Sequence, residues 1–118
     1  MKIIVQILVL LTLVSCKNQD AKPIAQKATR ALGQQLFETS NCVACHQTAQ
    51  NVVGPSLQSI ATIYKQKNGN MVAFLKEEAE PIVAPENYES MKLNLEITKT
   101  MTDSELKSLE LYILSYSK

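Results

Sequence analysis

The sequence has 118 residues, of which 46% are hydrophobic and 19% are charged, a composition typical of one small globular domain. Its 12 basic and 11 acidic residues give a formal net charge of +1, which argues against a nucleic-acid-binding protein with a basic surface. Three cysteines are too few for a fold held together by disulfides, and a single histidine excludes any site that needs two. We therefore expect one hydrophobic core and one functional site.

The first 15 residues have the features of an export signal. Lys2 provides a positive charge, and residues 3–14 are apolar except for one glutamine and one threonine. This run is shorter than the roughly 20 residues of a membrane-spanning helix, so we expect a secretory signal peptide over residues 1–15. Residues 13–16, Leu-Val-Ser-Cys, resemble the lipobox of bacterial lipoproteins, which implies cleavage before Cys16 and lipidation of that residue. The alternative is a buried N-terminal helix with an incidental cysteine.

A polar tether is expected between this lipid anchor and the folded domain. Residues 16–26 contain Pro23 and show no periodic pattern, so the domain is predicted to occupy residues 27–118. The anchor would hold the exported protein at a membrane, facing the periplasm. Charge is unevenly distributed, with six basic and two acidic residues over 17–75 but five and nine over 76–118. Such an asymmetry can orient a protein toward a partner, although charged runs are more often only solvated surfaces.

The domain is predicted to be all-α, because no stretch alternates convincingly over the length of a strand. Helices are expected over residues 27–40, 57–67 and 71–80, the last of these ended by Pro81. Within the first helix, Gly33 would permit a close approach by another helix.

The last helix has the clearest pattern in the sequence. Residues 102–105, Thr-Asp-Ser-Glu, form a capping box that begins it. Its apolar stripe consists of Leu106, Leu109, Ile113 and Tyr116. Residues 86–100, which precede this helix, are expected to be irregular.

The chemistry of the sequence lies in residues 42–46, Cys-Val-Ala-Cys-His, the C-x-x-C-H pattern of c-type haem attachment. Two thiols three residues apart can add to the two vinyl groups of one haem, and the adjacent histidine can then ligate the iron. An export signal supports this interpretation, because bacteria attach haem covalently on the outer side of the inner membrane.

Three other sites could use some of these residues. A structural zinc site needs four Cys or His ligands, and the sequence brings only Cys42, Cys45 and His46 close together. A thioredoxin-like dithiol needs a β-α-β context, which this sequence lacks. A structural disulfide between the two cysteines would leave His46 without a role.

From Ala28 to Ser115 the sequence resembles the small monohaem class I cytochromes c of bacteria. Gly33 and Phe37 match the first-helix pattern of that family, which implies contact with an aromatic residue of the last helix, here Tyr112. The resemblance implies the class I cytochrome c fold, with four to five short helices wrapped around one haem c. That haem would be covalently attached through Cys42 and Cys45, with His46 as an iron ligand.

A second motif follows the first at a family-like distance. Residues 54–57, Gly-Pro-Ser-Leu, match the family's Gly-Pro-x-Leu turn, and Pro55 lies nine residues after His46. The resemblance implies that the Pro55 carbonyl accepts a hydrogen bond from the ligating imidazole and so orients it.

A methionine is expected as the sixth iron ligand, as is usual in the family, and such ligation raises the reduction potential. Met91 lies 45 residues after His46, and residues 91–94, Met-Lys-Leu-Asn, are similar to the family's Met-Pro-x-Asn except that lysine replaces proline. Met101 is the alternative, although it directly precedes a helix cap, where a hydrophobic residue often packs on the first turn. Met71 opens a predicted helix and is expected to belong to the core.

The resemblance implies a one-electron carrier, not an enzyme, that exchanges electrons with a redox-protein donor and acceptor in a respiratory or denitrification chain. The alternatives are a five-coordinate haem that senses ligands or reduces peroxide, and a docked cytochrome subunit of a larger oxidoreductase. We expect a monomer, anchored to the membrane through Cys16, without nucleic-acid partners.

Tyr64 and Lys65 lie where family members often reach a haem propionate. The expected haem walls are Ile60, Leu75, Ile82, Val83 and Leu95.

Overall fold

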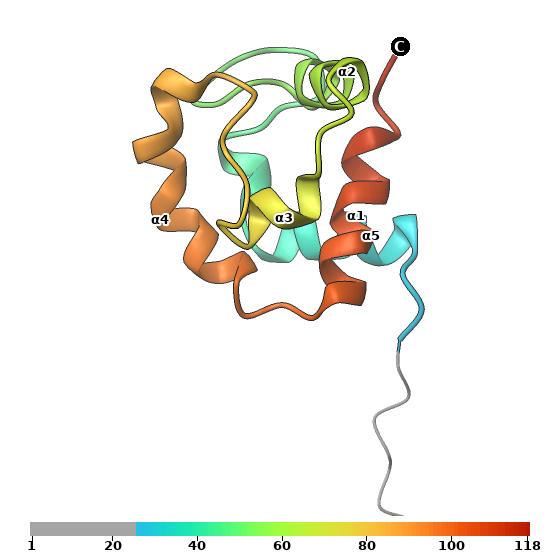
Figure 1. Ribbon diagram of the computed structural model, residues 1–118. Coiled ribbons are helices and arrows are strands. Elements are labelled where there is room, and N and C mark those ends of the chain that lie inside the picture. Colours follow the sequence, from blue (N-terminus) through green and yellow to red (C-terminus); the bar gives the residue numbers. More distant parts are fainter. Residues whose placement is uncertain (1–25) are drawn as a thin grey trace, which may run out of the picture.

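Helices account for the regular structure of residues 26–118, the part of the chain that the computed structural model describes (Figure 1). The α-helices are α1 (Arg30–Thr39), α2 (Leu57–Gln66), α3 (Met71–Leu75), α4 (Tyr88–Thr98) and α5 (Asp103–Leu114), and the 3₁₀ helices are η1 (Cys42–Ala44) and η2 (Pro85–Asn87). Over this range there is no strand, and no helix is both long and apolar enough to cross a membrane. The predicted all-α class is therefore confirmed. The expected signal peptide, Cys16 and all but the last residue of the tether lie outside the described residues.

The contact between α1 and α5 joins the two ends of the domain (Figure 1). A Cβ atom added to Gly33 would lie 1.9 Å from the carbonyl oxygen of Ser108, so the two helix backbones touch at this point. One turn further along α1, Phe37 packs on Tyr112 with 5.4 Å between ring centroids. The close approach predicted from Gly33 and the aromatic contact implied by the resemblance are both confirmed.

The predicted capping box begins α5. The Thr102 hydroxyl accepts a hydrogen bond from the Glu105 amide at 3.3 Å, and the Glu105 carboxylate accepts one from the Thr102 amide at 2.8 Å. Three members of the predicted apolar stripe, Leu106, Leu109 and Ile113, are buried. The fourth, Tyr116, lies just beyond the end of the helix, where its hydroxyl is hydrogen-bonded to that of Tyr112.

The helix predicted over residues 71–80 is wrong in extent, because α3 ends at Leu75. The Asn70 side chain accepts a hydrogen bond from the Ala73 amide at 3.0 Å and so begins the helix as a cap. Glu77 then takes the left-handed conformation, with φ 58°, and turns the chain away from the helix axis. Residues 82–84 can therefore return along the wall of the central pocket.

The prediction that residues 86–100 are irregular is also wrong, because most of these residues form η2 and α4. Leu95 is fully buried, and the buried hydroxyl of Thr98 donates a hydrogen bond to the Leu75 carbonyl at 2.6 Å. These contacts hold one face of α4 against the end of α3. Leu93 and Ile97 are exposed on the other side of α4, which blurs the amphipathic pattern by which such a helix is recognised.

Replacing Gly33 with alanine should separate α1 from α5, since the new methyl group would overlap backbone rather than a movable side chain. We expect a loss of about 3 kcal/mol in the free energy of unfolding of the haem-loaded protein, measured with guanidinium chloride. Gln35→Ala, an exposed site on the same helix, is the control and should change stability little. A Gly33→Ala protein as stable as this control would contradict the proposed packing.

Candidate functional site

A pocket in the middle of the domain receives side chains from all five α-helices. Most of its lining is apolar, and among the described residues no lysine, arginine, aspartate or glutamate contributes to it. Four of the predicted haem walls, Ile60, Leu75, Ile82 and Val83, line the pocket as expected. The fifth, Leu95, does not line it and lies instead in the core.

The 3₁₀ helix η1 turns the C-x-x-C-H motif toward this pocket. Asn41 precedes it in the left-handed conformation, with φ 58°, and the amide of His46 closes the turn on the Cys42 carbonyl at 3.0 Å. Cys42, Cys45 and His46 all line the pocket, and both cysteines are free thiols. Burial raises the pKa of the Cys42 thiol, which therefore stays protonated at neutral pH in the haem-free chain.

The imidazole of His46 is held by the loop that follows the motif. Its Nδ1 lies 2.8 Å from the carbonyl oxygen of Pro55. A carbonyl can only accept, so Nδ1 carries the proton and Nε2 keeps a lone pair for a metal. Gly54 leaves room for the ring, because a Cβ atom at this position would lie 2.7 Å from Cε1 of His46. The hydrogen bond implied by the resemblance is therefore present.

Local hydrogen bonds fix the loop that carries Pro55. The Gly54 amide donates to the Cys45 carbonyl at 2.9 Å, and the Leu57 amide donates to the Gln47 carbonyl at 2.9 Å. The side chain of Asn51 accepts from the Ser56 amide at 2.8 Å. The loop is thus tied to the haem motif at one end and to the start of α2 at the other.

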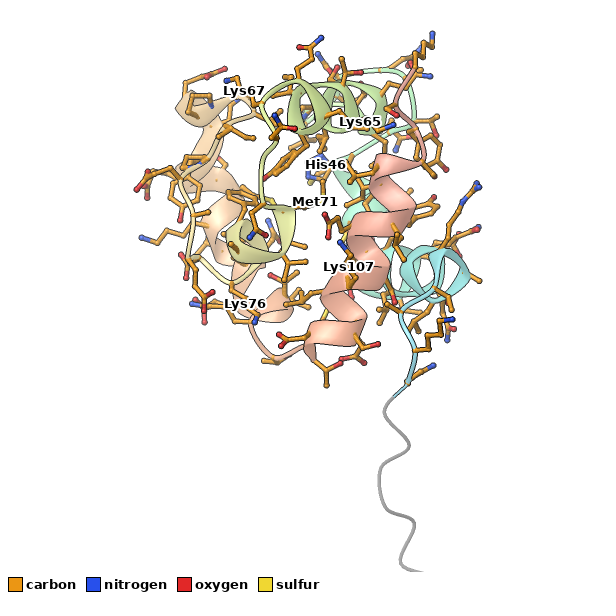
Figure 2. The ribbon with its side chains drawn as sticks, turned by 45° about the vertical axis from the view of Figure 1, so that its right-hand side comes forward. His46, Lys65, Lys67, Met71, Lys76 and Lys107 are labelled. Atoms are coloured by element: carbon orange, nitrogen blue, oxygen red, sulfur yellow. The ribbon has the colours of Figure 1, made fainter. Side chains whose placement is uncertain are left out.

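Two methionines reach the pocket. Met91 lines it from the first turn of α4 and is half-buried, so the structure brings this predicted ligand into the same pocket as His46. Met71, which the sequence assigned to the core alone, is 2% exposed and also lines the pocket; Figure 2 shows Met71 and His46 in the interior of the domain. Met101 is half-buried but does not line the pocket.

Several pocket residues were not predicted from the sequence. Phe74 and Tyr88 form a tilted aromatic pair with ring centroids 6.2 Å apart, and both line the pocket. They come from α3 and α4, and no local pattern connects them. Asn94 also lines the pocket, and its place three residues after Met91 in the family-like motif was a signal that could have identified it.

Only one of the two residues expected near a haem propionate lines the pocket. Tyr64 is buried and lines it, and burial raises the pKa of its hydroxyl to about 12. Lys65 is exposed and does not line the pocket.

The donor set fits a covalently attached haem c better than the other sites considered. Two free thiols and an oriented imidazole share one apolar pocket with a thioether, which is what thioether attachment and axial ligation require. A zinc site needs converging ligands, and no three His, Cys, Asp or Glu side chains among residues 26–118 are placed to hold a metal ion. The described chain also has no β-α-β unit for a thioredoxin-like dithiol.

Comparisons with known proteins agree with this geometry. Residues 30–117 match the sequence model of the family described as Cytochrome c. A segment of 33 residues, 28% of this chain, is 48% identical to the cytochrome c-552 of Nitrosomonas europaea. The matched segment spans 32% of that relative, so the chain covers only about a third of its length.

Gly54→Ala should push the His46 ring away from the Pro55 carbonyl and lengthen their hydrogen bond. A weaker hydrogen bond makes the imidazole a poorer electron donor, which favours ferrous iron, so we expect the reduction potential of the haem-loaded protein to rise. Potentiometric titration measures this change, and Val52→Ala, at an exposed position of the same loop, should leave the potential unchanged. Equal potentials for all three proteins would show that Gly54 does not position the ring.

Proposed function

Because this chain belongs to the cytochrome c family, whose members are electron carriers with covalently bound haem c, we propose that it carries single electrons between redox proteins. When bound, haem c supplies a reversible change between ferric and ferrous iron. The observation that carries the proposal is the pocket itself, where two thiols, an oriented imidazole and a methionine lie together. Among residues 26–118, no aspartate, glutamate, lysine or arginine side chain lines this pocket.

We assign the attachment of haem to Cys42 and Cys45 and the first axial ligand to His46. The thiols lie at the two ends of one short turn and face the same pocket, which suits two thioether bonds to one haem. The Pro55 carbonyl fixes the proton on Nδ1, leaving Nε2 for iron, and increases the basicity of the ring. These residues hold and orient the cofactor without taking part in bond changes during electron transfer.

We assign the second axial ligand to Met91. It lines the pocket while keeping partial exposure, whereas Met71 is packed into the hydrophobic core and Met101 lies outside the pocket lining. A thioether is soft and neutral, so it favours the reduced iron and adds no charge. With both axial positions filled, the iron would have no place for oxygen or a substrate.

We further propose that the carrier is exported and anchored to a membrane through lipid on Cys16. The support is the sequence of residues 1–16, with its short apolar run and lipobox-like end. Two or three acyl chains on one cysteine give stable attachment to a membrane. The carrier would then move electrons along the periplasmic face of that membrane, within a respiratory or denitrification chain, as a monomer.

The ligand assignment predicts that Met91 is the one of these three methionines whose replacement removes the iron–sulfur bond. The oxidised haem-loaded protein should show the weak far-red absorbance band that marks methionine sulfur on ferric iron. Met91→Ala should abolish this band and allow carbon monoxide to bind the reduced protein. Met71→Leu and Met101→Ala should keep the band.

Each variant should first show the visible spectrum of covalent haem, so that loss of the band is not loss of the cofactor. A band retained in Met91→Ala but lost in Met71→Leu would transfer the ligand role to Met71. Carbon monoxide binding to the unmodified reduced protein would instead favour the ligand-sensing or peroxidase-type alternative. Absence of covalent haem would contradict the proposal as a whole.

The anchor predicts a difference in cell fractionation. The unmodified protein should incorporate labelled fatty acid and sediment with membranes, whereas Cys16→Ser should lose the label and appear in the soluble periplasmic fraction. Ser15→Ala is a matched control next to the cleavage point and should remain lipidated. Recovery of the unmodified protein in the soluble fraction without label would contradict the anchor.

A further inference from the structure

Few contacts attach α4, the helix that carries Met91, to the other helices. Among the helices of residues 26–118, only the adjoining η2 packs closely along its backbone, and Figure 1 shows α4 on the side of the domain opposite α5. Leu95 is buried in the core, and Thr98 is bonded to the Leu75 carbonyl near the end of α4. Neither of these two contacts lies in the first turn, which carries Met91 and has no side-chain cap.

The carboxylate of Glu77 reaches both ends of α4. Its Oε1 accepts a hydrogen bond from the Tyr88 hydroxyl at 3.3 Å, and its Oε2 lies 2.5 Å from the Lys99 ammonium nitrogen. Tyr88 is the first residue of α4, and Lys99 directly follows the last. A helix of 11 residues is about 16 Å long, so two long side chains bring its opposite ends to one group. We call these two contacts the Glu77 clamp, which opposes both a tilt of α4 and a shift along its axis.

The clamp requires an ionised carboxylate, which its partners favour. The hydrogen bond from Lys99, with help from the Tyr88 hydroxyl, keeps the pKa of the Glu77 carboxyl below its usual value, so the group is charged at neutral pH. The side chains of Glu77 and Lys99 are 18% and 33% exposed, so water screens this pair less than a fully exposed one. Glu96, the other carboxylate paired with Lys99, is 68% exposed and belongs to α4 itself.

Glu77 occupies a backbone position that usually belongs to glycine. Beyond α3, the Glu77 amide donates to the Phe74 carbonyl at 2.9 Å, and the Glu78 amide donates to the Ala73 carbonyl at 2.8 Å. This pair of bonds is the Schellman motif, whose left-handed residue, here Glu77 with φ 58°, is most often glycine. A residue with a side chain costs free energy in this conformation, and such strain is concentrated at functional sites. At this position the side chain provides the link to α4.

A contact that holds the first turn of α4 also holds Met91. Met91 lies three residues after Tyr88, so the two side chains share one face of the helix, and both line the pocket. The Tyr88 ring also packs against Phe74 of α3, so its ring and its hydroxyl fix this turn at two points. A tilt of α4 that broke the hydrogen bond to Glu77 would withdraw Met91 from the pocket.

We propose that Glu77 is a positioning residue whose carboxylate clamps α4 at both ends and so keeps Met91 beside the haem iron. The proposal rests on the assignment of Met91 as the sixth ligand. Glu77 does not line the pocket and acts through Tyr88 and Lys99. Without the clamp, α4 would be open in a larger fraction of the molecules, and the position opposite His46 would then be available to an added ligand.

Titration of the oxidised haem-loaded protein with imidazole measures this opening. Imidazole can bind only after Met91 has left the iron, so its apparent affinity follows the fraction of open protein, and loss of the far-red band reports its binding. Glu77→Gly removes the carboxylate and retains the left-handed turn, which glycine adopts readily. We expect about tenfold tighter imidazole binding for this variant. Tyr88→Phe keeps the ring and loses only the hydroxyl, so it should give a smaller increase in affinity.

Glu96→Gln is the matched control, because it removes a carboxylate that pairs with the same lysine but does not link α4 to α3. This variant should bind imidazole as the unmodified protein does. Hydrogen exchange of the haem-loaded protein gives a readout that does not depend on an added ligand. The amides of residues 88–98 should exchange faster in Glu77→Gly, whereas those of residues 103–114 should keep their rates.

An imidazole affinity in Glu77→Gly equal to that of the control would overturn the proposal. Equally faster exchange in α4 and α5 would also overturn it, since Glu77 would then stabilise the whole domain rather than position one helix. If Glu77→Gly does not fold around haem, an unchanged imidazole affinity in Tyr88→Phe overturns the proposal by the same criterion. A far-red band retained in Met91→Ala would overturn the ligand assignment itself. Loss of that band, with unchanged imidazole affinity in the Glu77 and Tyr88 variants, would overturn only the clamp.

Discussion

The backbone contact between α1 and α5 is the constraint on which the rest of the domain depends. Gly33 lets the first and last helices touch, and the Thr29 amide reaches across 79 residues to the Ser108 hydroxyl at 3.0 Å. Because α1 leads directly into η1, this contact also fixes the place of the two thiols. Leu109 and Ile113 of α5 also line the pocket. The contact that joins the first and last helices therefore also positions residues of the pocket.

Most features that could be predicted from the residues alone are encoded by a few neighbouring residues. The long-range contact of Phe37 with Tyr112 was expected only from the resemblance to the cytochromes c. The capping box of α5 and the turn of the C-x-x-C-H motif involve side chains within five residues of one another. The contact of His46 with Pro55 spans nine residues, and glycine at position 54 makes it sterically possible. The capping box follows from a local pattern, whereas the contact of His46 with Pro55 was expected only from the resemblance to the cytochromes c.

The features that could not be predicted depend on contacts between distant segments. The helix α4 is held by Leu95 in the core and by the bond from Thr98 to Leu75, which no local pattern reveals. The early end of α3 reflects a left-handed Glu77, although glutamate has no preference for that conformation. Met71 was correctly predicted to be buried, but core and pocket wall are the same surface here, and its presence in the pocket required the structure.

The uncharged lining of the pocket has a consequence for the exchange of electrons. No amine or carboxylate side chain of the described residues faces the site, and the Tyr64 hydroxyl, with a pKa of about 12, keeps its proton throughout the physiological range. The described side chains that line the pocket therefore offer no carboxylate or amine to take up a proton when an electron arrives. Under the proposed function, a change in the oxidation state of the iron would leave the charge of these side chains as it is.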